Sequence, residues 1–304
     1  MSLTIASVNV NGIRAATKVR SEINHGMLEW LRHTAADVVV MQEVRASGDQ
    51  AVTALQPALD NGWHLVVAPA EAPGAKGRAG VGILSREPLA EVEIGIPGFE
   101  DSGRFIAGTL VDGTRVASLY LPSGAAETAK QDEKYEFLDR FEPLLDNWPS
   151  IYPRMVIGGD WNICHRREDL KNWRTNRTKS GFLPHERAFM DSVFGTFPDE
   201  EAQDLKDKQA DGWSGAVGYV SEGRREANRD PQWFDVARRL QPDHAPYTWW
   251  TYRGQAFNND AGWRIDYQAA TAAMLERAKR SWVEKVPTVE ERWSDHSPLL
   301  VEYN

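Results

Sequence analysis

Short runs rich in β-branched and aromatic residues recur along the chain, and helical patterns separate only some of them. Such runs predict strands when turn residues bound them. Between residues 79 and 121 one run follows another directly, which implies hairpins and therefore sheets of mixed direction. We expect an α/β (α+β) fold with two mixed β-sheets packed face to face and helices outside. The predicted strands are Leu3–Val10, Asp37–Met41, His64–Ala68, Ala79–Ser85, Arg104–Val111, Arg115–Leu121, Met155–Gly158 and Pro298–Tyr303.

Three segments carry apolar residues at helical spacing. They are Met27–His33, Ala129–Trp148, which is expected to close before Pro149, and His185–Phe194, which follows a proline at a helix start. No repeat or Pro/Gly/Ser-rich linker divides the chain, so we expect one domain over residues 1–304. Apolar residues are sparse in Pro198–Arg229, and we expect a surface insertion at about 204–229.

The sequence lacks the patterns typical of membrane segments and of sites built from several cysteines. The start lacks a basic segment followed by a long apolar run, and no stretch of about 18 apolar residues occurs. The single cysteine, Cys164, cannot form an internal disulfide or a multi-cysteine metal site. We therefore expect a soluble, cytoplasmic protein with no membrane partner, whose metal ligands, where present, are oxygen or histidine.

The formal charge of −9, from 35 basic and 44 acidic residues, argues against nucleic-acid binding through the overall field of the protein. Two stretches, 166–179 and 224–239, are locally basic and offer a candidate face for such binding. The alternative is that each is a solvated surface of mixed charge.

Polar residues gather at the downstream ends of the predicted strands. A sheet holds side chains rigidly at these ends while loops leave them accessible, so the groups can converge on one site. The residues are Asn9, Asn11, Gln42, Glu43, Tyr120, Asp160 and Asn162, with Asp266, Asp295 and His296 following near the C-terminus.

The residue types at these ends suit a hard cation and a phosphate. Glu43, Asp295 and Asn9 offer oxygen ligands for Mg²⁺ or Mn²⁺. Asp160 can position and deprotonate an attacking water. An imidazole from His296, oriented by Asp266, can stabilise charge on phosphoryl oxygens.

Each residue also has an ordinary structural interpretation. Acidic residues after strands often cap helices or form turns, and Asn9-Val-Asn11-Gly fits a simple turn. Tyr120 can be a half-buried aromatic, and His296 a hydrogen-bonded structural histidine. Gly158–Asn162 can be only a tight turn.

Taken together, the segments resemble the endonuclease/exonuclease/phosphatase superfamily from residue 4 to residue 303. The resemblance implies a four-layered α/β sandwich with the site at one edge of two sheets. Six motifs carry it: Asn9-Val-Asn-Gly-Ile-Arg14, Gln42-Glu-Val-Arg45, Tyr120-Leu-Pro-Ser123, Gly159-Asp-Trp-Asn162, Trp263-Arg-Ile-Asp-Tyr267 and Ser294-Asp-His-Ser-Pro298.

Further segments are similar to the exonuclease III branch, which contains the apurinic/apyrimidinic endonucleases. These segments are Lys171-Asn-Trp, Gly181-Phe-Leu-Pro-His-Glu-Arg187 and Tyr247-Thr-Trp-Trp-Thr-Tyr252. The resemblance implies that Trp249 and Trp263, with Ile265 beside them, line a pocket for a flipped abasic sugar, which is cheap to extrude because it has no stacked base. Arg253 corresponds to a residue that some relatives insert into the duplex. For Trp250 a place in the core is the alternative.

The resemblance implies one-step hydrolysis of duplex DNA by a monomer that carries Mg²⁺, with Mn²⁺ as a possible substitute. Its substrates would be DNA with abasic sites or blocked 3′ ends, attacked as an exonuclease, an abasic-site endonuclease and a 3′-phosphatase. The implied metal set is Asn9, Glu43, Asp160, Asn162, Asp295 and His296, the catalytic set is Tyr120, Asp160, Asn162, Asp266 and His296, and the DNA set is Asn11, Arg45, Trp249, Arg253, Trp263 and Ile265.

Two departures from the branch pattern and one rival function remain open. Ser123 stands where many relatives place an amide that touches phosphate, so Asn11 is a candidate to replace that contact. The insertion can supply phosphate contacts through Arg224, Arg225 and Arg229, or can be a surface loop with no catalytic part. The rival is a phosphatase or phosphodiesterase of the same superfamily that acts on a substrate other than DNA.

Overall fold

The computed structural model of the protein describes residues 2–72, 77–198, 214–223 and 226–304. Two six-stranded sheets of mixed direction form its centre, with strand orders β11-β12-β1-β2-β4-β3 and β5-β6-β7-β8-β10-β9. The first sheet contains β1 (Leu3–Asn9), β2 (Val38–Gln42), β3 (His64–Ala68), β4 (Val81–Ser85), β11 (Ala278–Val283) and β12 (Leu299–Tyr303). The second contains β5 (Ala90–Ile94), β6 (Phe105–Thr109), β7 (Arg115–Tyr120), β8 (Met155–Asp160), β9 (Trp233–Asp235) and β10 (Asp266–Thr271).

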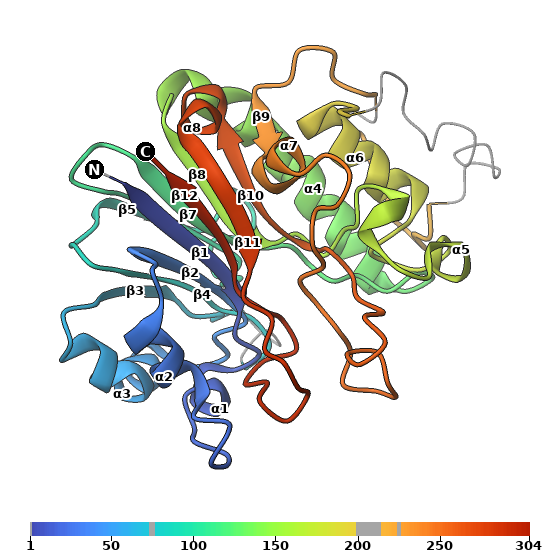
Figure 1. Cartoon of the computed structure of the whole chain (residues 1–304). Coiled ribbons are helices and arrows are strands. Elements are labelled where there is room, and N and C mark those ends of the chain that lie inside the picture. Colours follow the sequence, from blue (N-terminus) through green and yellow to red (C-terminus); the bar gives the residue numbers. More distant parts are fainter. Residues whose placement is uncertain (1, 73–76, 199–213, 224–225) are drawn as a thin grey trace.

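Helices cover the outer faces of both sheets, and the result is a four-layered sandwich (Figure 1). Helices α2 (Gly26–His33) and α3 (Gly48–Leu59) bury Met27, Leu31 and Leu55 against the first sheet. Helices α4 (Ala129–Ile151) and α6 (Pro184–Phe194) cover the second sheet. The predicted fold class is therefore confirmed. Shorter helices are α1 (Ile13–Ala16), α5 (Trp173–Asn176), α7 (Val236–Leu240), α8 (Ala272–Arg277) and the 3-10 turn η1 (Arg167–Asp169).

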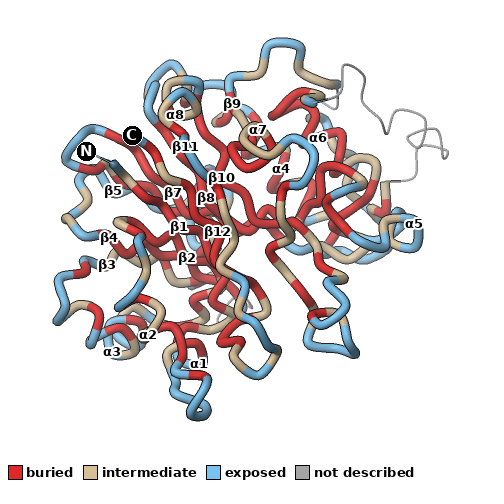
Figure 2. The backbone as a smooth tube through the Cα atoms, in the orientation of Figure 1, coloured by how far each residue is buried: buried red, intermediate tan, exposed pale blue. Residues whose placement is uncertain are grey.

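The central strands are buried on both faces, as the red tube in Figure 2 shows. In β1, Ile5 points between the sheets while Ala6 and Val8 point to the helices, because side chains alternate along a strand. Gly158 of β8 lies where the sheets approach closely, since a Cβ there would lie 2.6 Å from Cγ2 of Val40. This close approach brings the ends of β1 and β8 together.

Helix α4 differs from its predicted end. It runs through Pro149 to Ile151, although proline removes one helical hydrogen bond. The carbonyl that Pro149 leaves without a donor is that of Leu145, four residues earlier, and it accepts a hydrogen bond of 2.7 Å from the indole of Trp233. A contact from β9 thus compensates the proline.

The expected insertion is described only in part, and Arg224 and Arg225 lie outside the described residues. Residues 214–223 form no helix or strand and pack over α4, where the Tyr219 hydroxyl donates to Asp139 over 3.0 Å. Among the described residues, no helix combines the length and the apolar character needed to cross a bilayer.

Candidate active site

The predicted polar residues converge where the downstream ends of β1, β2, β7 and β8 meet the start of β10 and the segment before β12. In the second sheet Tyr120 and Asp266 pair in register with Asp160, so three neighbouring strands present one functional group each. In the first sheet Asn9 pairs with Gln42, just before Glu43. Both groups face the gap between the sheets.

Asn9 connects the two sheets through its side-chain amide. Its Nδ2 donates to Oε1 of Glu43 and to Oδ2 of Asp160, each over 2.9 Å, while its Oδ1 accepts from the backbone N–H of Asn11 over 2.9 Å. These partners determine the amide orientation, because a flipped amide would face two carboxylates with its oxygen. Asn9 therefore presents N–H groups to the site, and ligation through its oxygen would require the amide to turn.

Glu43 receives donors from both sides. The Tyr120 hydroxyl donates to Oε1 over 2.8 Å, and the Arg45 guanidinium pairs with Oε2. Burial, followed by the charges of Glu43 and Asp160, raises the pKa of Tyr120 well above its usual value. The tyrosine consequently stays a neutral hydrogen-bond donor.

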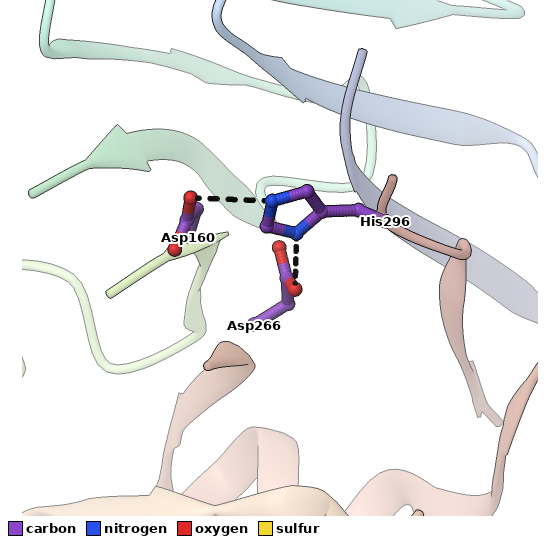
Figure 3. A group of neighbouring side chains, drawn as sticks. All are labelled: Asp160, Asp266 and His296. Atoms are coloured by element: carbon purple, nitrogen blue, oxygen red, sulfur yellow. Dashed lines mark hydrogen bonds and ion pairs between the residues drawn. The ribbon is translucent and has the colours of Figure 1, made fainter. Parts of the chain in front are cut away.

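His296 lies between two buried carboxylates, from β8 and β10 (Figure 3). Its Nδ1 is 2.8 Å from Oδ2 of Asp266, and its Nε2 is 3.8 Å from Oδ2 of Asp160. Burial opposes its charge, but the charge and hydrogen bond of Asp266 outweigh burial and raise the pKa of His296 to about 10. The imidazole is thus a cation at neutral pH, and the structure contains the predicted pairing of His296 with Asp266.

Burial also raises the pKa of Asp160, to about 7, with the negative charges of Asp266 and Glu43 acting in the same direction and His296 opposing them. A carboxylate with a pKa near neutrality suits a general base. Its Oδ1 accepts the backbone N–H of Asn162 over 3.0 Å.

Asn162 is held by its own donors and acceptors. Its Nδ2 donates to the carbonyl of Leu121 over 2.9 Å, and its backbone carbonyl accepts from Nζ of Lys134 over 2.9 Å. The side-chain oxygen is the group left to face a ligand, so it can accept a hydrogen from water.

Asp295 is an ionised carboxylate with one donor on each oxygen. Asn11 donates to Oδ1 over 2.8 Å and Trp249 donates to Oδ2 over 3.0 Å. Burial opposes the charge of Asp295, but His296 and these hydrogen bonds lower its pKa below the usual value. The side-chain amide of Asn11 is thus engaged with Asp295.

The described site carries more negative than positive charge. Four carboxylates gather there, and the cations beside them are Arg45, His296 and Arg292, whose guanidinium donates to the backbone carbonyl of Asp295 over 2.8 Å. Ligand atoms of Asp160, Asp266 and His296 lie within 4.8 Å of one another and form a possible metal-binding cluster. The oxygen-rich donor set fits a hard cation. The carboxylates are Glu43, Asp160, Asp266 and Asp295.

The backbone at the site is strained. Of seven non-glycine residues with positive φ among those described, four belong to the predicted set. Such conformations cost on the order of 1–3 kcal/mol each and persist where surrounding structure enforces them. The four are Asn11, Glu43, Arg45 and Asn162.

Trp249 and Trp263 form an aromatic pair beside the carboxylates. Their rings lie 5.9 Å apart at 85°, and Trp249 is 6.5 Å from the His296 ring. Ile265 packs in the same apolar cluster. Gly181, with φ of 93°, leaves room for the pair, because a Cβ there would lie 2.9 Å from Cζ3 of Trp263.

The neighbours of the aromatic pair differ in exposure. Trp250 is 2% exposed and donates to Asp260 over 3.0 Å, so the alternative of a core aromatic holds for it. Arg253 lies in an exposed loop, and no ion pair joins it to the site carboxylates within the described part of the chain.

The basic stretches divide into buried and exposed residues. Arg166 and Arg238 are buried and pair with Asp191 and Asp169, so they are structural and not part of a binding face. Exposed cations lie beside the aromatic pair instead. They follow Leu170 in the chain, and Leu170 forms an isolated β-bridge with Trp263. They are Lys171, Arg174, Arg177 and Lys179.

Two features near the site were not predicted from the sequence. A groove of about 670 Å³ beside Tyr120 is lined in part by Arg78, Arg104 and Lys130. Lys134 is fully buried and pairs with Glu186 over 2.6 Å while holding Asn162. A lysine on the inner face of an amphipathic helix carries no sequence signal for this role.

Comparisons with known proteins agree with this geometry. The model of the Endonuclease/Exonuclease/phosphatase family matches residues 6–296. An exodeoxyribonuclease of Bacillus subtilis is 25% identical over 98% of this chain and 98% of its own. The DNA repair nuclease APEX1 of Danio rerio is 27% identical over 99% of this chain and 82% of its own. A 3′ phosphatase from Neisseria, solved bound to a product DNA hairpin, superposes with a TM-score of 0.75 at 26% identity, covering 99% of both chains.

Proposed function

The chain belongs to the Endonuclease/Exonuclease/phosphatase family, and we propose that it hydrolyses phosphodiester bonds at lesions and 3′ ends of double-stranded DNA. The observation that carries the proposal is one buried cluster, in which His296 lies between Asp160 and Asp266. Asn9 connects Asp160 of this cluster to Glu43, and the aromatic pair of Trp249 and Trp263 lies beside it. The relatives named as nucleases and the DNA-bound structural neighbour support this substrate.

Asp160 is the proposed general base. Its pKa of about 7 allows it to take a proton from a water at neutral pH. The open oxygen of Asn162 would orient this water. Attack by the water on phosphorus would break the bond to the leaving oxygen in one step, with no covalent intermediate on the protein.

Tyr120 and His296 are the proposed stabilisers of the transition state. Both are donors at neutral pH, so they can neutralise charge that develops on phosphoryl oxygens. Asp266 would hold the imidazolium in position. A neutral donor and a cation on opposite sides of Asp160 suit a phosphate placed between them.

The oxygen-rich, acidic donor set supports a divalent cation, and we propose Mg²⁺ with Mn²⁺ as a substitute. When bound, the cation would supply Lewis-acid polarisation of the phosphate. Glu43 and Asp295 would hold it from the two sides of the site, with Asn9 bridging Glu43 to Asp160. The wider proposed ligand set also includes Asp160 and Asn162, and Asn9 would join it only if its amide turned and His296 only as a neutral imidazole.

The exposed cations Lys171, Arg174, Arg177 and Lys179 are the proposed phosphate contacts of the duplex. They suit DNA because 171–179 contains no acidic residue, so the protein carries a local basic rim despite its net charge of −9. Further proposed contacts come from Asn11, Arg45 and Arg253.

The aromatic pair, with Ile265, is the proposed receptor of an abasic sugar. A flat apolar surface accepts a sugar that lacks a base, and such a nucleotide costs little to extrude. The names of the relatives, a DNA repair nuclease and a 3′ phosphatase, support DNA repair and 3′-end cleaning by this site. We further propose that residues 1–304 form one nuclease domain and that the protein is a monomer. We also propose a cytoplasmic location, because the single cysteine is typical of proteins in reducing compartments.

The test uses four substrates with the purified protein and Mg²⁺: a duplex with one tetrahydrofuran abasic analogue, a blunt duplex, a duplex with a 3′-phosphate, and inositol phosphate. We expect incision 5′ to the analogue, 3′ trimming and phosphate release, with no action on the inositol phosphate. The control Asp160→Asn should lose at least a hundredfold in rate. Hydrolysis of the inositol phosphate alone would establish the rival function, and an Asp160→Asn variant as active as the wild type would refute the mechanism.

A further inference from the structure

Trp249 contacts both parts of the proposed site. Its ring forms the aromatic pair with Trp263 at 5.9 Å. Its Nε1 donates to Oδ2 of Asp295 over 3.0 Å. The backbones of Trp249 and His296 form an isolated β-bridge. The side chain of Trp249 therefore contacts both the aromatic surface proposed to bind the sugar and a carboxylate proposed to bind the cation.

Asp295 has few other contacts that define its orientation. Among the described side chains, the donor to its second oxygen is Asn11, which is itself one of the residues with strained backbone, at φ of 47°. The carboxylate is partly exposed, so without the indole one oxygen would exchange its protein donor for water. Partners that orient metal-binding carboxylates typically change metal affinity by 10–100-fold when they are removed.

We propose that Trp249 is a positioning residue, whose indole N–H orients Asp295 for the divalent cation and thereby couples cation binding to occupancy of the aromatic pair. The inference rests on the proposed function in that it takes Asp295 as a cation ligand. By linkage, a sugar that fixes the Trp249 ring would strengthen cation binding, and the cation would strengthen binding of the sugar by the same factor.

The chain offers a matched control. Trp263 is the other member of the aromatic pair and carries the same indole, but no hydrogen bond joins its ring nitrogen to the described residues. Trp249→Phe and Trp263→Phe each keep an aromatic ring and remove one pyrrole N–H. Only the first removes a donor to Asp295.

The primary measurement is Mn²⁺ affinity of the DNA-free protein, by electron paramagnetic resonance. We expect Trp249→Phe to bind Mn²⁺ about tenfold more weakly than the wild type, at the lower end of the usual range because Asn11 still holds Asp295. Trp263→Phe should bind within about twofold of the wild type. In an Asp295→Asn background, Trp249→Phe should cause no further loss, since the two residues act through one path.

Equal Mn²⁺ affinity of Trp249→Phe and the wild type would overturn the inference, as would equal weakening in both phenylalanine variants. Circular dichroism and urea midpoints establish that the variants fold. A second measurement needs only wild-type protein labelled with ¹⁵N-tryptophan, in which Mg²⁺ should shift the indole resonance of Trp249 more than that of Trp263. Because neither measurement contains DNA, loss of DNA cleavage would refute the proposed function and leave this inference standing.

Discussion

Replacing Lys134 by methionine tests whether a buried ion pair behind the site determines both stability and the position of Asn162. The lysine side chain is completely buried, and its Nζ lies 2.6 Å from Oε1 of Glu186 and 2.9 Å from the carbonyl of Asn162. Methionine has a similar length and apolar stem, so the substitution removes the charge and its hydrogen bonds with little change in packing.

The expected loss follows from what remains around Glu186. Breaking a buried pair by removing one partner costs about 3–5 kcal/mol because a buried charge is left uncompensated. Here Glu186 keeps four donors: the backbone N–H groups of Gly181 and Leu183, at 2.7 and 2.9 Å, and the side chains of Ser180 and Gln131, at 3.0 and 3.1 Å. We therefore expect the lower end, about 3 kcal/mol.

Urea unfolding followed by circular dichroism measures this loss, with an unchanged m-value expected. Adding Glu186→Gln to Lys134→Met should recover at least about 1 kcal/mol, since it removes the unpaired charge. The DNA-cleavage rate of folded Lys134→Met should fall while substrate affinity changes little, because Asn162 loses an anchor. A loss below about 1 kcal/mol, or a double variant less stable than Lys134→Met, would refute the reasoning.

Three further predictions concern single sites. Gly181→Ala should destabilise the fold by about 1–3 kcal/mol, because it combines φ of 93° with a Cβ 2.9 Å from Trp263; the urea midpoint measures this, and an unchanged midpoint would contradict the close approach. The pKa of His296 is raised in the fold, to about 10, so its contribution to stability is fully present below the unfolded pKa of about 6.5 and is lost as pH rises through about 10. Urea midpoints of the metal-free protein should accordingly fall between pH 7 and 10, more steeply than those of His296→Gln. Arg174→Ala should lower the slope of log affinity against log salt by about 1 on any duplex, as loss of one phosphate contact requires; an unchanged slope in fluorescence anisotropy would remove Arg174 from the DNA face.

Sequence patterns located much of the fold because they report local physics. The strand His64–Ala68 matches β3, and the end of Ala129–Trp148 differs by only three residues from α4. That difference comes from a contact with Trp233, 88 residues away from Leu145, which no local pattern contains. Helix α3 was not predicted, although Ser47 and Gln50 form a capping box at its start.

The candidate site, like the fold, could be predicted from the sequence only in part. The residue types near strand ends indicated which groups converge, because hydrophobic periodicity and turn residues in the sequence show where strands begin and end. The direction of a hydrogen bond is a tertiary property, so the sequence did not reveal that Asn9 presents N–H groups to Glu43 and Asp160. Charge runs also do not report burial, which is why Arg238 and Arg174 looked alike in the sequence and occupy different environments.

Strain and unbalanced charge coincide at the site, and together they explain why its supports are so extensively paired. Left-handed backbone at Glu43 and Asn162 costs free energy, and so do the burial and the neighbouring carboxylates that raise the pKa of Asp160. These costs persist only if packing behind the site opposes relaxation. The Lys134–Glu186 pair supplies that opposition on one side, and on the other Asp169 binds Arg264 through both carboxylate oxygens, at 2.8 and 3.2 Å. Since a divalent cation would relieve the charge but not the backbone strain, we expect the paired supports to matter for activity even in the loaded protein.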